Sequence, residues 1–348
     1  MLAWLTYVFV EKPIRFGQTG NIRIAALAAS LALVGCAGYY TYAHGGLPNR
    51  SANRALEEGF QEKLQFNQQQ LTWFGPDPAC FQLTGLEEER KNQQEVFCSL
   101  KDDLDSVQVA IIGDSTANAL YPGFRKVLNE RGIGLINLGN AKCGPYRGLQ
   151  GTVDWNKDCD QIDRKIYDFL LANSRIKTVI LGMVAWDVPD MRFDGIPDNA
   201  PLQAKFAMFD ALVNRDIAAL RAAGKNVVIT YDTPPFATDA RVCIPRSPRD
   251  KLPAACTPTE DQLRSKEREP FVSMWKAILA KHKDVCIFEQ SPYLKTNGRF
   301  HMLNSDGILL FRDDHHLTYV GSEYIARKFF ESPCGPAIEG LARTGEWK

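Results

Sequence analysis

The strongest constraint on the fold is the alternation of short apolar segments with longer amphipathic segments from Val107 onward. Each apolar segment is continuous, which is typical of strands buried on both faces of a parallel sheet. The predicted strands cover residues 107–112, 134–138, 178–181, 227–231 and 285–288, and the predicted helices cover 117–130, 159–173, 202–223 and 261–282. Because parallel strands need right-handed crossover helices, the sequence predicts an α/β fold. It is a three-layer α/β/α sandwich with a parallel, flavodoxin-like sheet over residues 105–348.

An uncharged run of about 20 residues precedes this domain at 24–43, and about that length is needed to cross the hydrocarbon core of a bilayer. Lys12, Arg15 and Arg23 stand ahead of the run, and basic residues mark the cytoplasmic side of a span. We therefore predict one transmembrane helix at residues 21–44. A secretory signal ending in the lipoprotein-like box Leu33-Val34-Gly35-Cys36 is the alternative. Both interpretations place the following chain outside the cytoplasm.

The remaining N-terminal segments are not expected to form part of the sheet. The apolar stretch 1–10 is too short to span a membrane alone, so it suggests the tail of another membrane helix or, as the alternative, an interfacial stretch. Residues 45–104 are predicted to be an extracytoplasmic, mostly helical extension with a helix from Ser51 to about Asn67. Lys and Arg number 41 and so do Asp and Glu, so the balanced charge disfavours a nucleic-acid binder.

The chain contains 9 Cys, an unusually high and odd number. Setting aside Cys36 in the apolar run leaves eight, and neighbouring cysteines are the simplest partners because short loops lose less entropy on closure. The expected pairs are Cys80/Cys98, Cys143/Cys159, Cys243/Cys256 and Cys286/Cys334. There is no CxxC motif, and the five His are dispersed except for His315-His316, so neither a metal site nor a cofactor is expected.

The first predicted strand ends in Gly113-Asp114-Ser115, and a helix follows. Ligands of such sheets bind at the carboxyl ends of the strands, so the Ser115 hydroxyl is expected at that edge. The nearby helix N-terminus would stabilise an anion there. The alternative is that Asp114 or Ser115 only caps the helix.

A second polar motif, Asp313-Asp314-His315-His316, lies near the C-terminus. A nucleophilic serine needs a base, and a histidine base needs a carboxylate on its other ring nitrogen. Asp313 and His316 could supply both from one loop. The alternatives are a solvated polar turn, or a register shifted by one residue in which His315 is the base.

These two motifs resemble the first and last sequence blocks of SGNH hydrolases. The run Asp-Asp-His-His-Leu-Thr at 313–318, the local cysteines and the apolar helix are more narrowly similar to the SGNH domains fused to acyltransferase-3 membrane proteins. Residues 6–15 (TYVFVEKPIR) resemble the end of the acyltransferase-3 domain. The resemblance implies four parts: a remnant of that domain at 1–20, the transmembrane helix at 21–44, the extension at 45–104 and an SGNH domain at 105–348.

The resemblance also implies residue roles. Ser115 would be the nucleophile, His316 the general base and acid, and Asp313 the residue that orients His316. Gly139 and Asn140, after the second strand, match the family's oxyanion glycine block moderately, and Trp186 would line an acyl or sugar pocket or be a core aromatic. The family's oxyanion asparagine is missing after the third strand, and Asn140 or Asn118 could replace it.

By this resemblance the chain is expected to transfer an acyl group, most simply acetyl, to an extracytoplasmic glycan such as lipopolysaccharide O-antigen. The implied partners are a membrane acyltransferase-3 domain as acyl donor and an envelope polysaccharide as acceptor. The implied location is the bacterial inner membrane, with the C-terminal domain in the periplasm. The alternatives are an envelope carbohydrate esterase and a non-catalytic glycan-binding domain.

Overall fold

The computed structural model describes residues 4, 7–12, 21–43, 54–70, 77–92, 95–151, 158–184, 188–231, 233–246, 250–263, 269–283, 285–336 and 338. The chain forms two compact units, Met1–Glu62 and Lys63–Lys348. The sheet and the candidate site both belong to the second unit. The predicted division into four parts stays a prediction.

The first unit contains a short π-helix, η1 (Tyr7–Glu11), and a long helix, α3 (Asn21–Ala43). Cys36 lies on α3 as an exposed free thiol. Among the residues described, no helix is both long and apolar enough to cross a membrane. The predicted transmembrane helix at 21–44 is helical over residues 21–43 but is not confirmed as a span.

The second unit is built on a six-stranded sheet with the order β1-β3-β2-β5-β7-β8. Its strands are β1 (Val96–Leu100), β2 (Val107–Gly113), β3 (Gly134–Asn140), β5 (Thr178–Gly182), β7 (Asn226–Tyr231) and β8 (Cys286–Glu289). The last five are mutually parallel, as predicted, because each is joined to the next through helical crossovers. The strand order changes direction at β2, because β3 lies on one side of it and β5 on the other. The carboxyl end of β2 is therefore the place where a ligand is expected.

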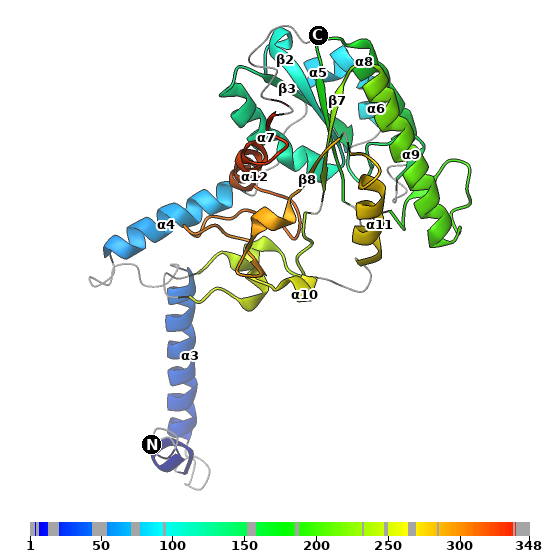
Figure 1. The fold of residues 1–348 in the computed structure, drawn as a ribbon. Coiled ribbons are helices and arrows are strands. Elements are labelled where there is room, and N and C mark those ends of the chain that lie inside the picture. The colour runs from blue at the N-terminus through cyan, green and yellow to red at the C-terminus, as the bar shows by residue number, and fades with distance from the viewer. Residues whose placement is uncertain are drawn as a thin grey trace. The chain divides into compact units, whose positions relative to one another are not determined.

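Helices cover both faces of the sheet (Figure 1). Two of them, α7 (Ser115–Asn129) and α12 (Tyr319–Glu331), pack with Val109, Ile111 and Ile180 on one face. The other face is covered by α8 (Cys159–Ala172), α9 (Leu202–Ala222) and α11 (Glu269–Leu279). The three-layer α/β/α prediction is thus confirmed.

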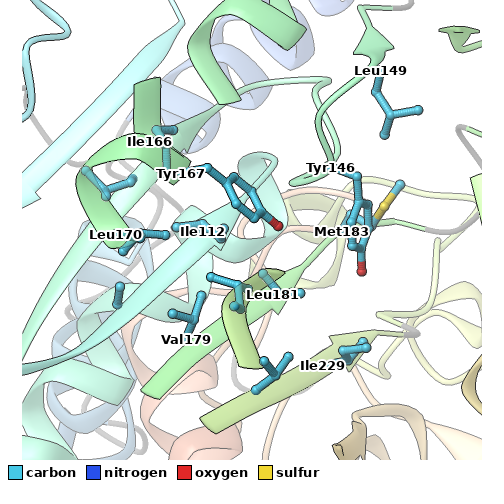
Figure 2. Packing of buried hydrophobic residues seen from close by; sticks show 14 of the residues in the cluster. Ile112, Tyr146, Leu149, Ile166, Tyr167, Leu170, Val179, Leu181, Met183 and Ile229 are labelled. Atoms are coloured by element: carbon cyan, nitrogen blue, oxygen red, sulfur yellow. The ribbon is translucent and has the colours of Figure 1, made fainter. Parts of the chain in front are cut away.

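The core beneath α8 and α9 shows why these segments form their elements. Figure 2 shows side chains from the sheet and side chains from α8, with a tyrosine and a methionine from loops nearby: Ile112, Val179, Leu181 and Ile229 of the sheet, Ile166, Tyr167 and Leu170 of α8, and Tyr146 and Met183. Strand residues alternate between the two faces, so Ala110 and Ile112 of β2 enter this core while Val109 and Ile111 enter the other. The continuous apolar strands are explained by burial on both sides.

Several elements were not expected from the sequence. Strand β1 comes from the predicted extension and pairs antiparallel with β3. The predicted helix 261–282 is described as two helices, α10 (Glu260–Leu263) and α11, and Pro270 stands in the first turn of α11, where proline is favoured. The predicted helix from Ser51 to about Asn67 is found as α4 (Arg54–Gln69). The smaller elements are α5 (Pro78–Thr84), α6 (Glu87–Asn92), η3 (Leu104–Ser106), β4 (Leu149–Gln150), β6 (Arg192–Phe193), η5 (Ala240–Cys243), η6 (Ala254–Cys256), η7 (Ser291–Leu294), β9 (Lys295–Thr296) and β10 (Arg299–Phe300).

Four disulfides join the predicted neighbours. Cys80–Cys98 ties α5 to β1, and Cys143–Cys159 ties the loop after β3 to the first residue of α8. Cys243–Cys256 closes the insertion after β7, while Cys286–Cys334 links β8 to the end of α12. Disulfides of this number indicate an oxidising compartment.

The longest of these loops should contribute most to stability. The Cys286–Cys334 disulfide closes a loop of 48 residues and Cys243–Cys256 one of 13. In the chain-entropy model, replacing both cysteines of a pair by Ala lowers the free energy of unfolding by about 4 kcal/mol for the former and about 3 kcal/mol for the latter. Urea unfolding of the two double variants measures the difference. Equal losses would contradict the loop-length argument.

Candidate active site

The turn between β2 and α7 places Ser115 at the carboxyl edge of the sheet. Asp114 is the N-cap of α7, and its Oδ1 accepts hydrogen bonds from the Thr116 backbone N–H at 2.8 Å and the Thr116 hydroxyl at 2.5 Å. Its Oδ2 accepts the backbone N–H of Val184, after β5, at 2.8 Å. Asp114 therefore performs the capping, and the Ser115 side chain is left for another contact.

Glycines allow three strand ends to meet beside Ser115. Gly113 is in register with Gly139 on β3 and with Gly182 on β5. Gly113 has φ +153°, and a Cβ there would lie 1.7 Å from the carbonyl oxygen of Gly182. Gly139 has φ +152°, and its Cβ would lie 2.0 Å from the carbonyl oxygen of Gly113. Glycine is therefore required at both positions for the three strand ends to pack this closely beside Ser115.

Residues 311–317, called the histidine loop below, form a tight turn that precedes α12. Phe311 and Leu317 make a β-bridge, and the Arg312 N–H donates to the His316 carbonyl at 2.9 Å. The carbonyl of Asp314 accepts the N–H of Phe236, which belongs to the insertion after β7, at 2.7 Å. The loop is therefore fixed both internally and from a neighbouring segment.

Close packing of α7 against α12 brings this loop to Ser115. The Ser322 hydroxyl on α12 donates to the Leu120 carbonyl at 2.7 Å and accepts the Gly123 N–H at 2.9 Å, both on α7. Ser322 is fully buried between the two helices. Because Ser115 begins α7 and His316 directly precedes α12, this contact sets the separation of the two side chains.

The structure brings Ser115, His316 and Asp313 into one hydrogen-bonded relay. Nε2 of His316 lies 2.7 Å from the Ser115 Oγ, and Nδ1 lies 2.8 Å from Oδ2 of Asp313. Oδ1 of Asp313 accepts the backbone N–H groups of His316 at 2.7 Å and His315 at 3.0 Å. This is the geometry of a nucleophile, a base and an orienting carboxylate. Their catalytic roles stay predictions.

Electrostatics favour the charge states that the relay needs. Burial lowers the pKa of His316 below 6.5, and the charge of His315 lowers it further, outweighing the hydrogen bond to Asp313 that raises it. Burial raises the pKa of Asp313, but hydrogen bonds from the His316 ring and from two backbone N–H groups bring it well below its usual range. At neutral pH the imidazole is therefore neutral and the carboxylate is ionised.

Arg312 is a buried cation beside the carboxylate. Only 5% of the residue is exposed, and its Nε lies 3.8 Å from Oδ2 of Asp313. Burial lowers the pKa of Arg312 to about 10, and Asp313 opposes that decrease. The guanidinium stays protonated at neutral pH and favours the ionised form of Asp313.

The residues predicted to hold an oxyanion are only partly brought together. The N–H of Ser115, at the first position of α7, belongs to the helix N–H groups that have no intrahelical acceptor. Gly139 and Asn140 end β3, with Gly139 opposite Gly113. Val184 stands where the family motif would place an asparagine, and it offers no side-chain donor. Trp186 lies outside the described residues.

Asn118 contacts the sheet below its edge. Its Oδ1 accepts Nδ2 of Asn137 at 2.6 Å, and Asn137 is in register with Ile111, two residues before the end of β2. The contact uses the Asn118 oxygen and leaves its Nδ2 group out. Replacement of the missing donor by Asn140 or by Asn118 stays a prediction.

His315 forms a second histidine–carboxylate pair. Its Nδ1 lies 2.6 Å from Oδ1 of Asp314, and its ring centroid lies 3.9 Å from that of His316. Asp313, His315 and His316 offer atoms close enough to bind one metal ion together. Both ring nitrogens of His316 are in hydrogen bonds with Asp313 and Ser115, so a metal ion would have to replace one of them. His316, not His315, contacts Ser115.

The sequence analysis missed three residues of the site, which differ in how visible they are in the sequence. Arg312 had one signal, a basic residue directly before the acidic pair. Ser322 had none, since a serine on an amphipathic helix is ordinarily solvated. Gly182 could have been found by the rule that parallel strands end at one edge, because it closes the third strand as Gly113 closes the first.

A serine at a strand–helix turn, bonded to a His–Asp pair at the carboxyl edge of a parallel sheet, defines the class of acyl-handling serine enzymes. A family model described as the SGNH domain (fused to AT3 domains) matches residues 79–331. The chain belongs to this family. None of the curated proteins matches it.

Among solved structures, one similar chain is the lipopolysaccharide acetyltransferase periplasmic domain of Salmonella ser. Paratyphi A. It shows 16% identity over 65% of this chain and 84% of that one, with a TM-score of 0.49. TesA shows 14% identity over 64% and 96%, with a TM-score of 0.35. A putative acylhydrolase of Bacteroides fragilis NCTC 9343 shows 11% identity over 77% and 100%, with a TM-score of 0.40.

The lowered pKa of His316 predicts how Ser115 reactivity depends on pH. Only the neutral imidazole can accept the serine proton, so phosphonylation of Ser115 by an organophosphorus fluoride should rise with pH and level off near neutrality. Because the His316 pKa lies below 6.5, the midpoint of the rise should also lie below 6.5. Intact mass after timed labelling measures the rate. A midpoint above 6.5 would contradict the assigned environment.

Matched substitutions in the histidine loop distinguish the two Asp–His pairs. Asp313→Asn should slow Ser115 labelling on the order of 1,000–10,000-fold, because it removes the carboxylate that fixes the His316 tautomer. Asp314→Asn, one residue away and outside the relay, should change the rate less than about threefold. Labelling kinetics of both variants check the assignment. The reverse ranking would make His315 the base.

Proposed function

We propose that the chain is an O-acyltransferase that uses Ser115 to carry an acyl group, most simply acetyl, to a hydroxyl of an extracytoplasmic glycan such as lipopolysaccharide O-antigen. The observation that carries the proposal is the Ser115–His316–Asp313 relay within a domain whose family is fused to AT3 domains. The four disulfides support an oxidising location such as the periplasm. The acyl donor would be an acyltransferase-3 domain in the bacterial inner membrane.

The first half-reaction forms an ester on Ser115. As its Oγ attacks the acyl carbonyl carbon, the hydroxyl proton moves to Nε2 of His316, and Asp313 stabilises the imidazolium. The N–H of Ser115 and the positive end of α7 face the negative charge that develops on the carbonyl oxygen. When the intermediate collapses, the bond to the donor breaks and His316 returns the proton to the leaving group.

The second half-reaction transfers the acyl group to the acceptor. A sugar hydroxyl gives its proton to Nε2 of His316 and attacks the ester carbonyl, and collapse releases the acylated sugar and regenerates the Ser115 hydroxyl. Water could perform the same attack, which would make the enzyme an esterase. With Val184 in place of an asparagine, one oxyanion donor is missing, and such a loss costs on the order of 100–1,000-fold in rate unless another group supplies it.

The test is to follow the acyl-enzyme by intact mass after adding p-nitrophenyl acetate, with and without purified O-antigen polysaccharide. We expect one acetyl adduct on Ser115 that the polysaccharide resolves at least about tenfold faster than water does, since an acceptor site supplies proximity that bulk water lacks. Ser115→Ala should give no adduct. Ser106→Ala, near the opposite end of β2, should react like the native protein.

The outcomes separate the candidate functions. Rapid loss of the adduct in water alone would overturn transfer and indicate an esterase. Absence of any adduct and of p-nitrophenol release would overturn both enzymatic functions and indicate a glycan-binding domain. Detection of acetylated sugar by mass spectrometry, dependent on Ser115, is the result expected for the transferase.

A further inference from the structure

The end of α4 and the residue that follows it carry two buried polar side chains on a largely exposed segment. Asn67 is 1% exposed and Gln70 is 7% exposed, whereas Gln68 and Gln69 between them are exposed. Residues three apart lie on one face of a helix, so both side chains point to the same neighbour. Buried polar side chains are costly unless they are hydrogen-bonded. Their partners therefore show what this face of α4 contacts.

Asn67 is bonded through both ends of its amide to the segment that leads into the histidine loop. Its Nδ2 donates to the Gly307 carbonyl at 3.1 Å, and its Oδ1 accepts the Leu309 N–H at 3.0 Å. The amide pairs with this backbone as the peptide of an adjacent strand would. Leu309 is fully buried, so its N–H is shielded from water in the native protein and depends on Asn67 for its hydrogen bond.

Gln70 reaches the other side of the histidine loop. Its Oε1 accepts the N–H of Val320 at 3.3 Å, in the first turn of α12. N–H groups of a first turn have no intrahelical acceptor. Thr318 caps the neighbouring N–H of Gly321 at 3.0 Å, and Gln70 thus completes the capping of the helix that begins where the histidine loop ends.

The two ends held by α4 are also bonded to each other. The Thr318 N–H donates to the Leu310 carbonyl at 2.9 Å, and the Thr318 hydroxyl donates to the Leu309 carbonyl at 2.7 Å. Asn67 and Gln70, called the α4 clamp below, therefore hold the backbone on both sides of the histidine loop. A shift of that backbone would move His316 relative to Ser115, and a displacement of about 1 Å can cost on the order of 100-fold in rate.

We propose that Asn67 and Gln70 are positioning residues for His316, so that the end of α4 is a working part of the catalytic domain. The inference rests on the proposed function only in that His316 is the base for Ser115. The hydrogen bonds of the two side chains go to the backbone of Gly307, Leu309 and Val320, and not to Ser115, Asp313 or His316. The α4 clamp acts through the backbone of the histidine loop, which carries Asp313 and His316.

The experiment uses the full chain with Asn67→Ala, Gln70→Leu and Gln70→Glu. Gln70→Glu keeps the acceptor for the Val320 N–H and places negative charge at a helix N-terminus, which is favourable. We expect kcat for p-nitrophenyl acetate to fall about 10- to 100-fold in Asn67→Ala and Gln70→Leu, with KM changed less than about threefold, because orientation and not binding is lost. Gln70→Glu should restore kcat to within about threefold of the native value.

Two control variants separate positioning from stability. Gln68→Ala changes an exposed residue of the same helix turn and should leave kcat unchanged. Lys225→Met removes a buried Nζ that donates to the carbonyls of Asn173 and Ile176 at the opposite end of the sheet, and it should lower the melting temperature without lowering kcat of the folded fraction. Native kcat in both Asn67→Ala and Gln70→Leu, or loss in Lys225→Met as well, overturns the proposal.

A second measurement does not need turnover. The His316 Nδ1 proton, bonded to Asp313, should give a sharp low-field resonance in the native protein, in Gln70→Glu and in Gln68→Ala. It should broaden by fast exchange in Asn67→Ala and Gln70→Leu at a temperature where both are folded. Unchanged resonances overturn the positioning role even if the native protein proves inactive, whereas inactivity of the native protein alone counts only against the proposed function.

Discussion

The contact between Nε2 of His316 and Oγ of Ser115 joins residues 201 positions apart, and much of the domain serves to maintain it. Neither residue lies in the sheet, so each depends on the helix beside it. Asp114 fixes the start of α7 by bonding both to Thr116 and to the end of β5. Ser322 fixes α12 against α7. The buried contact between α7 and α12 thus brings two residues that are far apart in sequence within hydrogen-bonding distance.

Much of the fold could be predicted because its parallel strands are buried on both faces. Their continuous apolar composition marks each one locally, and the bounds of β2, β3, β5 and β7 agree closely with the predicted segments. The disulfides followed the same local logic, since each joins neighbouring cysteines. Strand β1 was missed because its partner, β3, lies about 40 residues away and no short-range pattern reports an antiparallel edge pairing.

The residues of the site also divide into those that short motifs reveal and those that only the folded structure reveals. Ser115, Asp313 and His316 stand in short motifs whose chemistry is visible in the residues themselves. The groups that support them are ordinary polar residues that acquire a role only from their position: Arg312 through burial beside Asp313, and Asn67 through the backbone of Leu309. The composition of a glutamine-rich helical segment predicts that its side chains are solvated. Burial of two of them depends on tertiary contacts, which composition does not predict.

The attachment of α4 limits how this domain can be excised or recombined. The family match begins at residue 79, whereas the compact unit begins at Lys63, so a boundary drawn by sequence similarity would discard Asn67 and Gln70. A domain cut at the family boundary would keep Ser115, Asp313 and His316 but would lose the two side chains that hold the backbone on either side of the histidine loop.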